Sequence, residues 1–257
     1  MPVNKETGSD TQFTNVAPVY DLLMNSVPYT SWMEYLARIL HAKRARPRNV
    51  LDLACGTGNV TELLAEAGYS AVGVDIAPEM IKEAIRKADM KGLSIPYYVQ
   101  DGAKMDLPGK RFDLCVSLFD SLNYILEPDQ LYMTIERVYA HLTSNGLFVF
   151  DMNSEYALMN NFFDQNNIDT DDELRYIWTS SYNPESRRCT IDMEFTYYAR
   201  PDHPVKFKEV HHQFAYREDE VREMLQQVGY RNITTYRAYT FRATSPTTDR
   251  IYYVATR

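Results

Sequence analysis

The chain has 257 residues, of which 45% are hydrophobic and 24% are charged, and its formal net charge at pH 7 is −8. This length accommodates one large domain, or one domain with an insertion, and the composition is that of an ordinary globular protein. The negative charge excludes a broad basic surface for a nucleic-acid backbone. No apolar run approaches the ~20 residues of a membrane span, so we expect neither nucleic acid nor a membrane as a partner.

The cysteines and histidines exclude further classes of protein. The three cysteines are far apart and form no Cys-x-x-Cys pair, and no apolar segment near residue 1 resembles a signal peptide. A cytoplasmic protein without disulfides is therefore expected. The five histidines show no metalloenzyme spacing, which predicts no catalytic metal.

Residues 1–45 are predicted to form an N-terminal helical cap. The first 15 or so are polar and are expected to be mobile. Apolar and aromatic residues then cluster at 19–23 and again at 29–40, and Pro47 ends the helical stretch.

Residues 46–153 alternate between short apolar strands and helices, and we predict that they form the cofactor-binding core. Strands are expected at 49–53, 71–74, 97–99, 112–118 and 147–150. Helices are expected after Gly58, from Pro78 to Gly92, and from an N-cap at Asp129. Repeated βαβ units predict an α/β protein, with a parallel sheet covered by helices on both faces.

The pattern changes after residue 153. Residues 154–173 are polar and are predicted to form a surface loop. Three stretches of period-two alternation follow, at 176–182, 191–197 and 205–216, separated by turn residues that include 201–204. They predict an antiparallel β meander, which we assign to an inserted substrate-side subdomain at 154–213. Residues 214–257 return to the core pattern, with a helix ended by Gly229 and closing strands at 233–239 and 251–255.

The segment 50–58, Val-Leu-Asp-Leu-Ala-Cys-Gly-Thr-Gly, joins a strand to a helix through a glycine turn, where backbone is open to a ligand. A dinucleotide fingerprint requires a small residue three positions after Gly58, and this chain has the β-branched Thr61. A pyrophosphate would also be repelled by Asp52, whereas a ligand carrying an ammonium group would be attracted. No Gly-Lys-Ser/Thr motif is present, so this is not a triphosphate loop.

The pattern Asp52-x-Ala54-x-Gly56-x-Gly58, with Asp75 ending the second strand, resembles the class I S-adenosylmethionine-dependent methyltransferases. The resemblance covers most of the chain; Ala54 departs from it, since many members have glycine there. Narrower features resemble a bacterial small-molecule branch that includes sugar N-methyltransferases. The resemblance implies a Rossmann-like, seven-stranded, mostly parallel sheet with the antiparallel β meander inserted after the fifth strand.

The resemblance also implies S-adenosyl-L-methionine as cofactor and a role for each matching position. Asp75 would bind the ribose hydroxyls, because a carboxylate offers two acceptor oxygens, and Asp101 would accept from the adenine amino group. The other implied cofactor contacts are Tyr20, Tyr29, Trp32, Asp52, Ala54, Gly56, Gly58, Ile76, Met80, Gly102, Ala103 and Leu118.

The acceptor side is less determined by the sequence. Methyl transfer from a sulfonium requires alignment and exclusion of water, and a base only where the acceptor arrives protonated or is weakly acidic. The candidates are Asp120, Asn123 and Tyr124 after the fourth strand, with Asn153 after the fifth. His211 and His212 are neighbours on a predicted strand, so at most one faces a site; the sugar-modifying relatives favour His211.

Structural readings compete with these assignments, because strand-end carboxylates also cap turns and aromatic residues also fill cores. We expect transfer of a methyl group to nitrogen or oxygen of a small-molecule acceptor. An NAD(P)-dependent oxidoreductase and a non-catalytic S-adenosylmethionine-binding protein are the alternatives. A nucleic-acid or protein methyltransferase is disfavoured, because the chain lacks a basic surface and the Asn/Asp-Pro-Pro-Tyr/Phe segment. The acceptor and the oligomeric state stay open.

Overall fold

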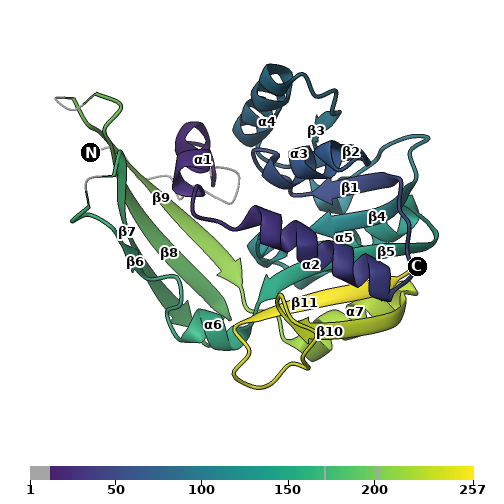
Figure 1. Cartoon of the computed structure of the whole chain (residues 1–257). Coiled ribbons are helices and arrows are strands. Elements are labelled where there is room, and N and C mark those ends of the chain that lie inside the picture. Colours follow the sequence, from purple (N-terminus) through teal and green to yellow (C-terminus); the bar gives the residue numbers. More distant parts are fainter. Residues whose placement is uncertain (1–11, 171, 201–202) are drawn as a thin grey trace.

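The computed structural model describes residues 12–170, 172–200 and 203–257, and it contains two β-sheets that lie side by side (Figure 1). The expected mobility of the first residues largely concerns residues 1–11, and part of the expected turn at 201–204 also lies outside the described residues. The strands are β1 (Asn49–Leu53), β2 (Ser70–Asp75), β3 (Tyr97–Val99), β4 (Phe112–Ser117), β5 (Leu142–Asn153), β6 (Gln165–Asn166), β7 (Leu174–Asn183), β8 (Arg188–Tyr197), β9 (Val205–Phe214), β10 (Arg231–Arg237) and β11 (Arg250–Thr256).

The helices connect and cover these strands. The α-helices are α1 (Tyr20–Leu23), α2 (Tyr29–Ala42), α3 (Asn59–Glu66), α4 (Pro78–Lys91), α5 (Pro128–His141), α6 (Glu155–Met159) and α7 (Glu218–Val228). Three short 3₁₀ segments matter for the site, and they are η2 (Ala17–Val19), η3 (Gly102–Lys104) and η4 (Ser121–Tyr124).

The larger sheet has seven strands in the order β10-β11-β5-β4-β1-β2-β3. Its first five strands in the chain run parallel, and β11 runs antiparallel between β5 and β10. The parallel strands carry mostly apolar residues at their centres, as expected where helices cover both faces of a sheet. Their carboxyl ends therefore meet at one edge, and the predicted Rossmann-like fold class is confirmed.

Two hydrophobic clusters attach the helices to this sheet. On one face, Leu36 of α2 and Leu64 of α3 pack in a cluster with side chains of β1, β4, β5 and β11, such as Val116 and Tyr252. On the other face, Ile135 of α5 and Leu225 of α7 pack in a cluster with alternate residues of the same strands, such as Leu51 and Phe148. The helix positions follow from the 3.6-residue spacing of these apolar side chains, and the prediction of helices on both faces is confirmed.

The smaller sheet is antiparallel, in the order β6-β7-β8-β9. A third hydrophobic cluster joins its inner face to η2, to Met80 of α4 and to Leu158 of α6. Figure 1 shows α1 between this sheet and α4. The predicted antiparallel meander is confirmed, and the segment before α1 lies between the two sheets.

Two local predictions were wrong. The N-cap of α5 is Glu127, and Asp129 lies inside the first turn because Pro128 takes the first helical position. The segment predicted as a surface loop at 154–173 contains α6, which Ser154 caps by accepting from the amide of Ala157, and the short strand β6. The polar residues around them concealed both elements, since each is only two to five residues long.

Candidate active site

A cavity of about 370 Å³ lies at the edge where the parallel strands end, roofed by the N-terminal segment and walled by the smaller sheet. Cavities of this size accommodate small molecules and cofactors. Its lining combines residues from 13 to 250, and most of it is apolar. Ten sequence-predicted site residues contribute, namely Tyr20, Ala54, Gly56, Asp75, Ile76, Met80, Asp120, Tyr124, Asn153 and His211.

The turn between β1 and α3 uses left-handed backbone at alternate positions. Ala54, Gly56 and Gly58 have φ of 57°, 55° and 82°. A Cβ on Gly58 would lie 2.5 Å from the hydroxyl of Tyr97, so this position requires glycine. A Cβ on Gly56 would meet nothing within 4 Å, so the turn presents open backbone to the cavity. Alanine at position 54 accepts a strain of about 1 kcal/mol or more.

Asp75, at the end of β2, holds this turn and faces the cavity. One carboxylate oxygen accepts from the amide of Gly56 and the other from the amide of Ala77, each at 2.8 Å. Burial raises the pKa of Asp75, and the amide donors oppose this shift. Each carboxylate oxygen keeps acceptor capacity for a ligand hydroxyl.

Asp52 does not line the cavity, which differs from the expected contact with the cofactor. Its carboxylate is 2% exposed behind the glycine turn and accepts from the hydroxyl of Thr61 at 2.5 Å. Burial raises the pKa of Asp52 to about 7. Thr61, the β-branched residue that argued against a dinucleotide, thus links the start of α3 to Asp52 at the end of β1.

Four predicted cofactor contacts also lie outside the cavity lining, namely Asp101, Gly102 and Ala103 after β3 and Leu118 after β4. Asp101 caps η3 by accepting from the amide of Ala103 at 2.9 Å. Gly102 is packed against Thr134 of α5, and Leu118 is buried against α2 and α3. Of the three strand-end carboxylates expected to converge on the cofactor, only Asp75 lines the cavity.

The cap contributes Tyr20 to the cavity, whereas Tyr29 and Trp32 support it from behind. Trp32 is buried and stacks on Tyr239, with ring centroids 5.5 Å apart. The hydroxyl of Tyr29 accepts from the side-chain amide of Asn59, 3.2 Å away. Neither lines the cavity, so the structure gives both the packing role that the sequence also allowed.

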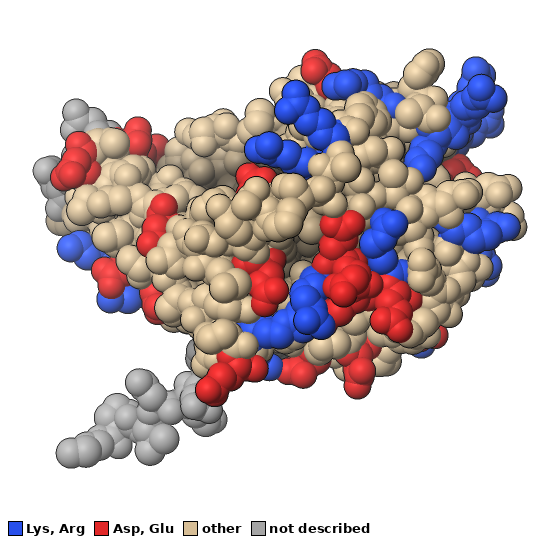
Figure 2. Space-filling model, turned by 90° about the horizontal axis from the view of Figure 1, so that it is seen from below, with Lys and Arg blue, Asp and Glu red and all other residues tan. Residues whose placement is uncertain are grey.

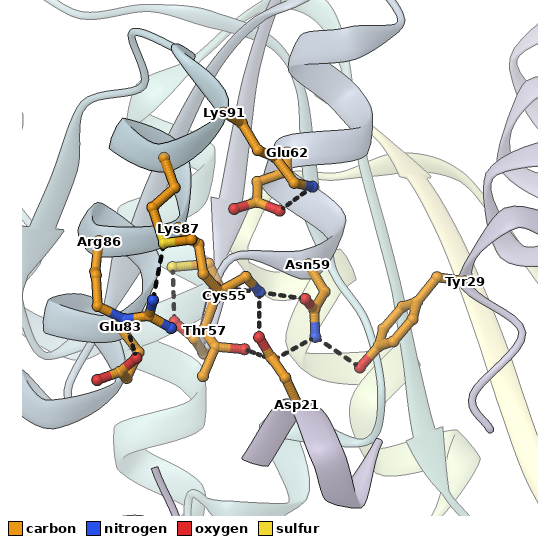
Figure 3. Close-up of polar contacts among 12 residues, drawn as sticks. Asp21, Tyr29, Cys55, Thr57, Asn59, Glu62, Glu83, Arg86, Lys87 and Lys91 are labelled. Atoms are coloured by element: carbon orange, nitrogen blue, oxygen red, sulfur yellow. Dashed lines mark hydrogen bonds and ion pairs between the residues drawn. The ribbon is translucent and has the colours of Figure 1, made fainter. Parts of the chain in front are cut away.

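Asp21 of α1 attaches the cap to the glycine turn (Figure 3). Its carboxylate accepts from the hydroxyl of Thr57 at 2.6 Å and from the side-chain amide of Asn59 at 3.0 Å. The ammonium of Lys87, on α4, lies 2.7 Å from its second oxygen. Burial would raise the pKa of Asp21, but Lys87 and Thr57 outweigh it and lower the pKa. The cap is thus tied to both helices that border the turn.

Tyr124 and His211, both predicted on the acceptor side, form a polar pair in the cavity lining. The hydroxyl of Tyr124 is 3.3 Å from Nδ1 of His211, and Nε2 of that ring is 2.7 Å from a carboxylate oxygen of Glu209. His211 is 2% exposed, while the next residue, His212, lies on the other side of β9 and contacts Thr190. As their adjacent positions on one strand predicted, the two histidines face opposite sides, and of the two only His211 lines the cavity.

Asp120 is held in a charged cluster and is not a free base. It forms an ion pair with Arg250 at 2.7 Å and accepts from the side-chain amide of Gln213 at 2.6 Å. Burial raises the pKa of Asp120, which Arg250 opposes. Asp151 pairs with the same guanidinium at 2.6 Å and accepts from the amides of residues 119 and 120, whose φ values are 68° and 49°.

Asn123 does not face the cavity. Its amide group donates to the carbonyls of Asn153 and Phe214, each at 3.1 Å, and accepts from the amide of Asn153 at 2.9 Å. These bonds are buried and join η4 to β5 and β9. Its side chain thus joins backbone segments, and its predicted role in catalysis stays a prediction.

Sequence reasoning missed three polar residues around the cavity, which are Glu209, Gln213 and Arg250. Glu209 and Gln213 flank His211 at two-residue spacing on β9, and these two side chains are buried, as is His211. That period-two run of polar residues, Glu-x-His-x-Gln, was a readable signal for a polar face turned inward. Arg250 had no such signal, because its partners are Asp120, just before η4, and Asp151 of β5, more than 90 residues earlier.

Among the described residues, no group of three or more histidine, cysteine, aspartate or glutamate side chains is arranged to hold a metal ion. In the same part of the chain, no helix has the length and apolar character needed to cross a membrane.

The fold is a Rossmann-like α/β fold with a cavity at its strand ends. Comparison with known proteins identifies the family. The family described as "Methyltransferase domain" matches residues 50–146. A protein of Geobacillus sp. (strain WCH70), a methyltransferase by name alone, is 32% identical over 240 residues, which are 92% of this chain and 96% of the relative. The chain belongs to the S-adenosylmethionine-dependent methyltransferases, and S-adenosylmethionine is the cofactor of that family.

Two solved structures extend the comparison. The crystal structure of an S-adenosylmethionine-dependent methyltransferase from Clostridium acetobutylicum has a TM-score of 0.83 at 30% identity, covering 95% of this chain and 98% of that one. A sugar N-methyltransferase from Streptoalloteichus shares the fold, with a TM-score of 0.74 at 21% identity, covering 93% and 92%. The family assignment favours methyl transfer over the alternative of an NAD(P)-dependent oxidoreductase.

Proposed function

We propose that the cavity binds S-adenosylmethionine beside the glycine turn and that the enzyme transfers the methyl group to nitrogen or oxygen of a small molecule. The observation that carries this proposal is the continuity of the cavity. It runs from the carboxylate of Asp75 to the Tyr124–His211 pair, so one enclosed space offers a cofactor end and an acceptor end.

The residues at the cofactor end fit the group. Asp75 has acceptor capacity for the ribose hydroxyls, and the open backbone at Gly56 leaves space for the methionine part. Ile76 is 60% exposed at the end of β2, and its contact with an adenine ring would cover an otherwise unexplained apolar surface. Met80 and Tyr20 line the same end. When bound, S-adenosylmethionine supplies an activated methyl group.

The polar groups at the acceptor end suit removal of a proton. Glu209 accepts only, so the hydrogen between it and His211 lies on Nε2, and Nδ1 is left to accept from the hydroxyl of Tyr124. Tyr124 then presents its oxygen to a bound amine or hydroxyl. Burial raises the pKa of Tyr124 well above its usual range, so it is protonated at neutral pH.

The charges of the cavity favour a neutral or cationic acceptor. Among its described lining residues, Asp75, Asp120 and Asp249 are acidic, and the guanidinium of Arg250 is already paired with Asp120. A phosphorylated acceptor would find no unpaired cation in that lining. On the face in Figure 2 basic side chains form no continuous field, which supports a small molecule over a nucleic acid.

The apolar acceptor wall consists mainly of side chains from β7, β8 and the segment after α6. The indole Nε1 of Trp178 is buried without a hydrogen-bond partner, and the side chain lines the cavity. An unsatisfied buried donor is costly, so an acceptor atom of the substrate would gain by meeting it. We also propose a cytoplasmic location, because the three cysteines are buried, unpaired thiols.

A two-stage experiment tests this function. Calorimetric titration with S-adenosylmethionine and with NADH is expected to show binding of the first only. Incubation of the protein with methyl-labelled S-adenosylmethionine and fractionated metabolite extract is then expected to label a small, unphosphorylated amine or alcohol. Binding without any labelled product in extracts of the source organism would favour the non-catalytic alternative, and absence of binding would refute the proposal.

A further inference from the structure

Glu209 is a buried carboxylate that receives four hydrogen bonds. Its side chain is 3% exposed on β9, the edge strand of the smaller sheet. One oxygen accepts from the amides of Asn15 and Val16 at 2.6 and 2.9 Å. The other accepts from the amide of Phe13 at 3.1 Å and faces Nε2 of His211 at 2.7 Å. Three of its four donors therefore belong to a segment almost 200 residues away.

We call residues 12–16 the strap, because they cross the cavity between the two sheets. Phe13 and Val16 line the cavity, and the ring of Phe13 lies 4.4 Å from that of His211, centroid to centroid. The side-chain oxygen of Gln12 also accepts from the amide of His212 at 2.9 Å. The position of the strap thus depends on β9, and mainly on Glu209.

The two roles of this carboxylate depend on each other. Burial would raise the pKa of Glu209, but His211 and the strap amides outweigh this and lower it. If the strap left, the carboxylate would lose three donors, and a buried charge with so few partners is strongly disfavoured. A change in its charge or orientation would then alter the hydrogen bond to His211.

We propose that Glu209 is a positioning residue that couples closure of the strap over the cavity to the tautomer and orientation of His211. The catalytic consequence rests on the proposed function. With the strap closed, Nδ1 of His211 accepts from Tyr124. As a bound acceptor gives its proton to the phenol oxygen, the phenol proton passes to Nδ1. The products are a deprotonated acceptor, a neutral phenol and an imidazolium beside the Glu209 carboxylate, so the number of protons is conserved.

The first test uses Glu209→Gln, with Glu194→Gln as the matched control. Glutamine has one acceptor oxygen and one donor group, so it cannot accept all four hydrogen bonds that the two oxygens of Glu209 receive. We expect the amides of residues 13, 15 and 16 to exchange hydrogen at least about tenfold faster, as for loss of a hydrogen bond to a charged group. Glu194 is exposed on the neighbouring β8, and its variant is expected to leave the exchange unchanged. Strap exchange within twofold of wild type in Glu209→Gln would overturn the proposal.

The second test acts from the strap. Asn15→Pro removes one donor to Glu209 at an exposed position that is not among the partners of His211, so it leaves the core intact. Nitrogen-15 NMR of labelled histidine distinguishes protonated from unprotonated ring nitrogens, and His211→Gln assigns the signals. We expect the His211 signals to shift or broaden in Asn15→Pro. Faster strap exchange with unchanged His211 signals would refute the coupling.

Both measurements use the protein without methyl acceptor or cofactor, which separates this inference from the proposed function. If the protein fails to bind S-adenosylmethionine while both readouts change as expected, the coupling stands and the proposed function fails. If binding and turnover are normal while neither readout responds, the proposed function stands and the coupling fails. Exchange of β1 amides, measured in the same samples, reports whether each variant is folded.

Discussion

Replacement of Asp75 by asparagine tests the cofactor end of the cavity most directly. The carboxylate accepts from two backbone amides at 2.8 Å, and asparagine keeps one acceptor oxygen while turning an amide donor toward the other. A hydrogen bond to a charged group contributes roughly 1.5–3 kcal/mol. Loss of one such bond to a ribose hydroxyl, together with a loosened glycine turn, is therefore expected to weaken binding about 10- to 100-fold.

Calorimetric titration with S-adenosylhomocysteine measures this effect, and Asp113→Asn is the matched control. Asp113 also accepts from two backbone amides, those of Arg48 and Asn49, at 2.9 and 3.0 Å. It lies at the opposite end of the sheet from the cavity, beside the first residue of β1. Its replacement is expected to lower stability and leave the affinity unchanged. An Asp75→Asn protein that binds within twofold of wild type would refute the ribose assignment.

Three further predictions concern stability. Gly58→Ala should lower the melting temperature measured by calorimetry, because its Cβ would meet Tyr97 at 2.5 Å. The loss should exceed that of Gly68→Ala, where φ is +91° but no atom lies within 4 Å of the added Cβ. Equal losses in the two variants would contradict the clash. Asp52 has a folded-state pKa of about 7, above its usual value, so its ionisation costs stability as the pH rises from about 4 to 7. In urea unfolding, the wild-type protein should lose roughly 4 kcal/mol of unfolding free energy to this ionisation over that pH range, and Asp52→Asn should not. The same pH dependence of stability in both proteins would refute the burial argument. Arg250→Met leaves two buried carboxylates without their cation and should cost about 3–5 kcal/mol in the same assay; a cost below 1 kcal/mol would show that the cluster is solvated.

The sequence predicted the fold well because local and global signals agree in the core. The bounds of β1 and β3, the proline at the start of α4 and the glycine after it are as expected from periodicity and capping. The wrong prediction of a surface loop at 154–173 lies where the signals are weak. A five-residue helix and a two-residue strand bury too little apolar surface to leave a pattern.

The site was predicted less completely, for a physical reason. Residues whose neighbours lie close in the chain, such as Ala54, Gly56 and Asp75, were found because the strand-turn-helix unit brings them together. Glu209 contacts residues almost 200 positions away, and no local pattern in a single sequence indicates that pairing. Asp101 was assigned to the adenine and Asn123 to the acceptor side by their positions in the sequence. In the structure Asp101 caps η3, and Asn123 joins η4 to β5.

The cavity takes its walls from stretches of chain that are separately encoded. The end beside the glycine turn is made by residues 54–80, and much of the opposite end by residues 157–193, on a sheet that shares no strand with the first. Substitutions at Trp178, Ile191 or Met193 can therefore reshape the second end and leave the glycine turn intact. The two ends of the cavity are thus open to independent engineering.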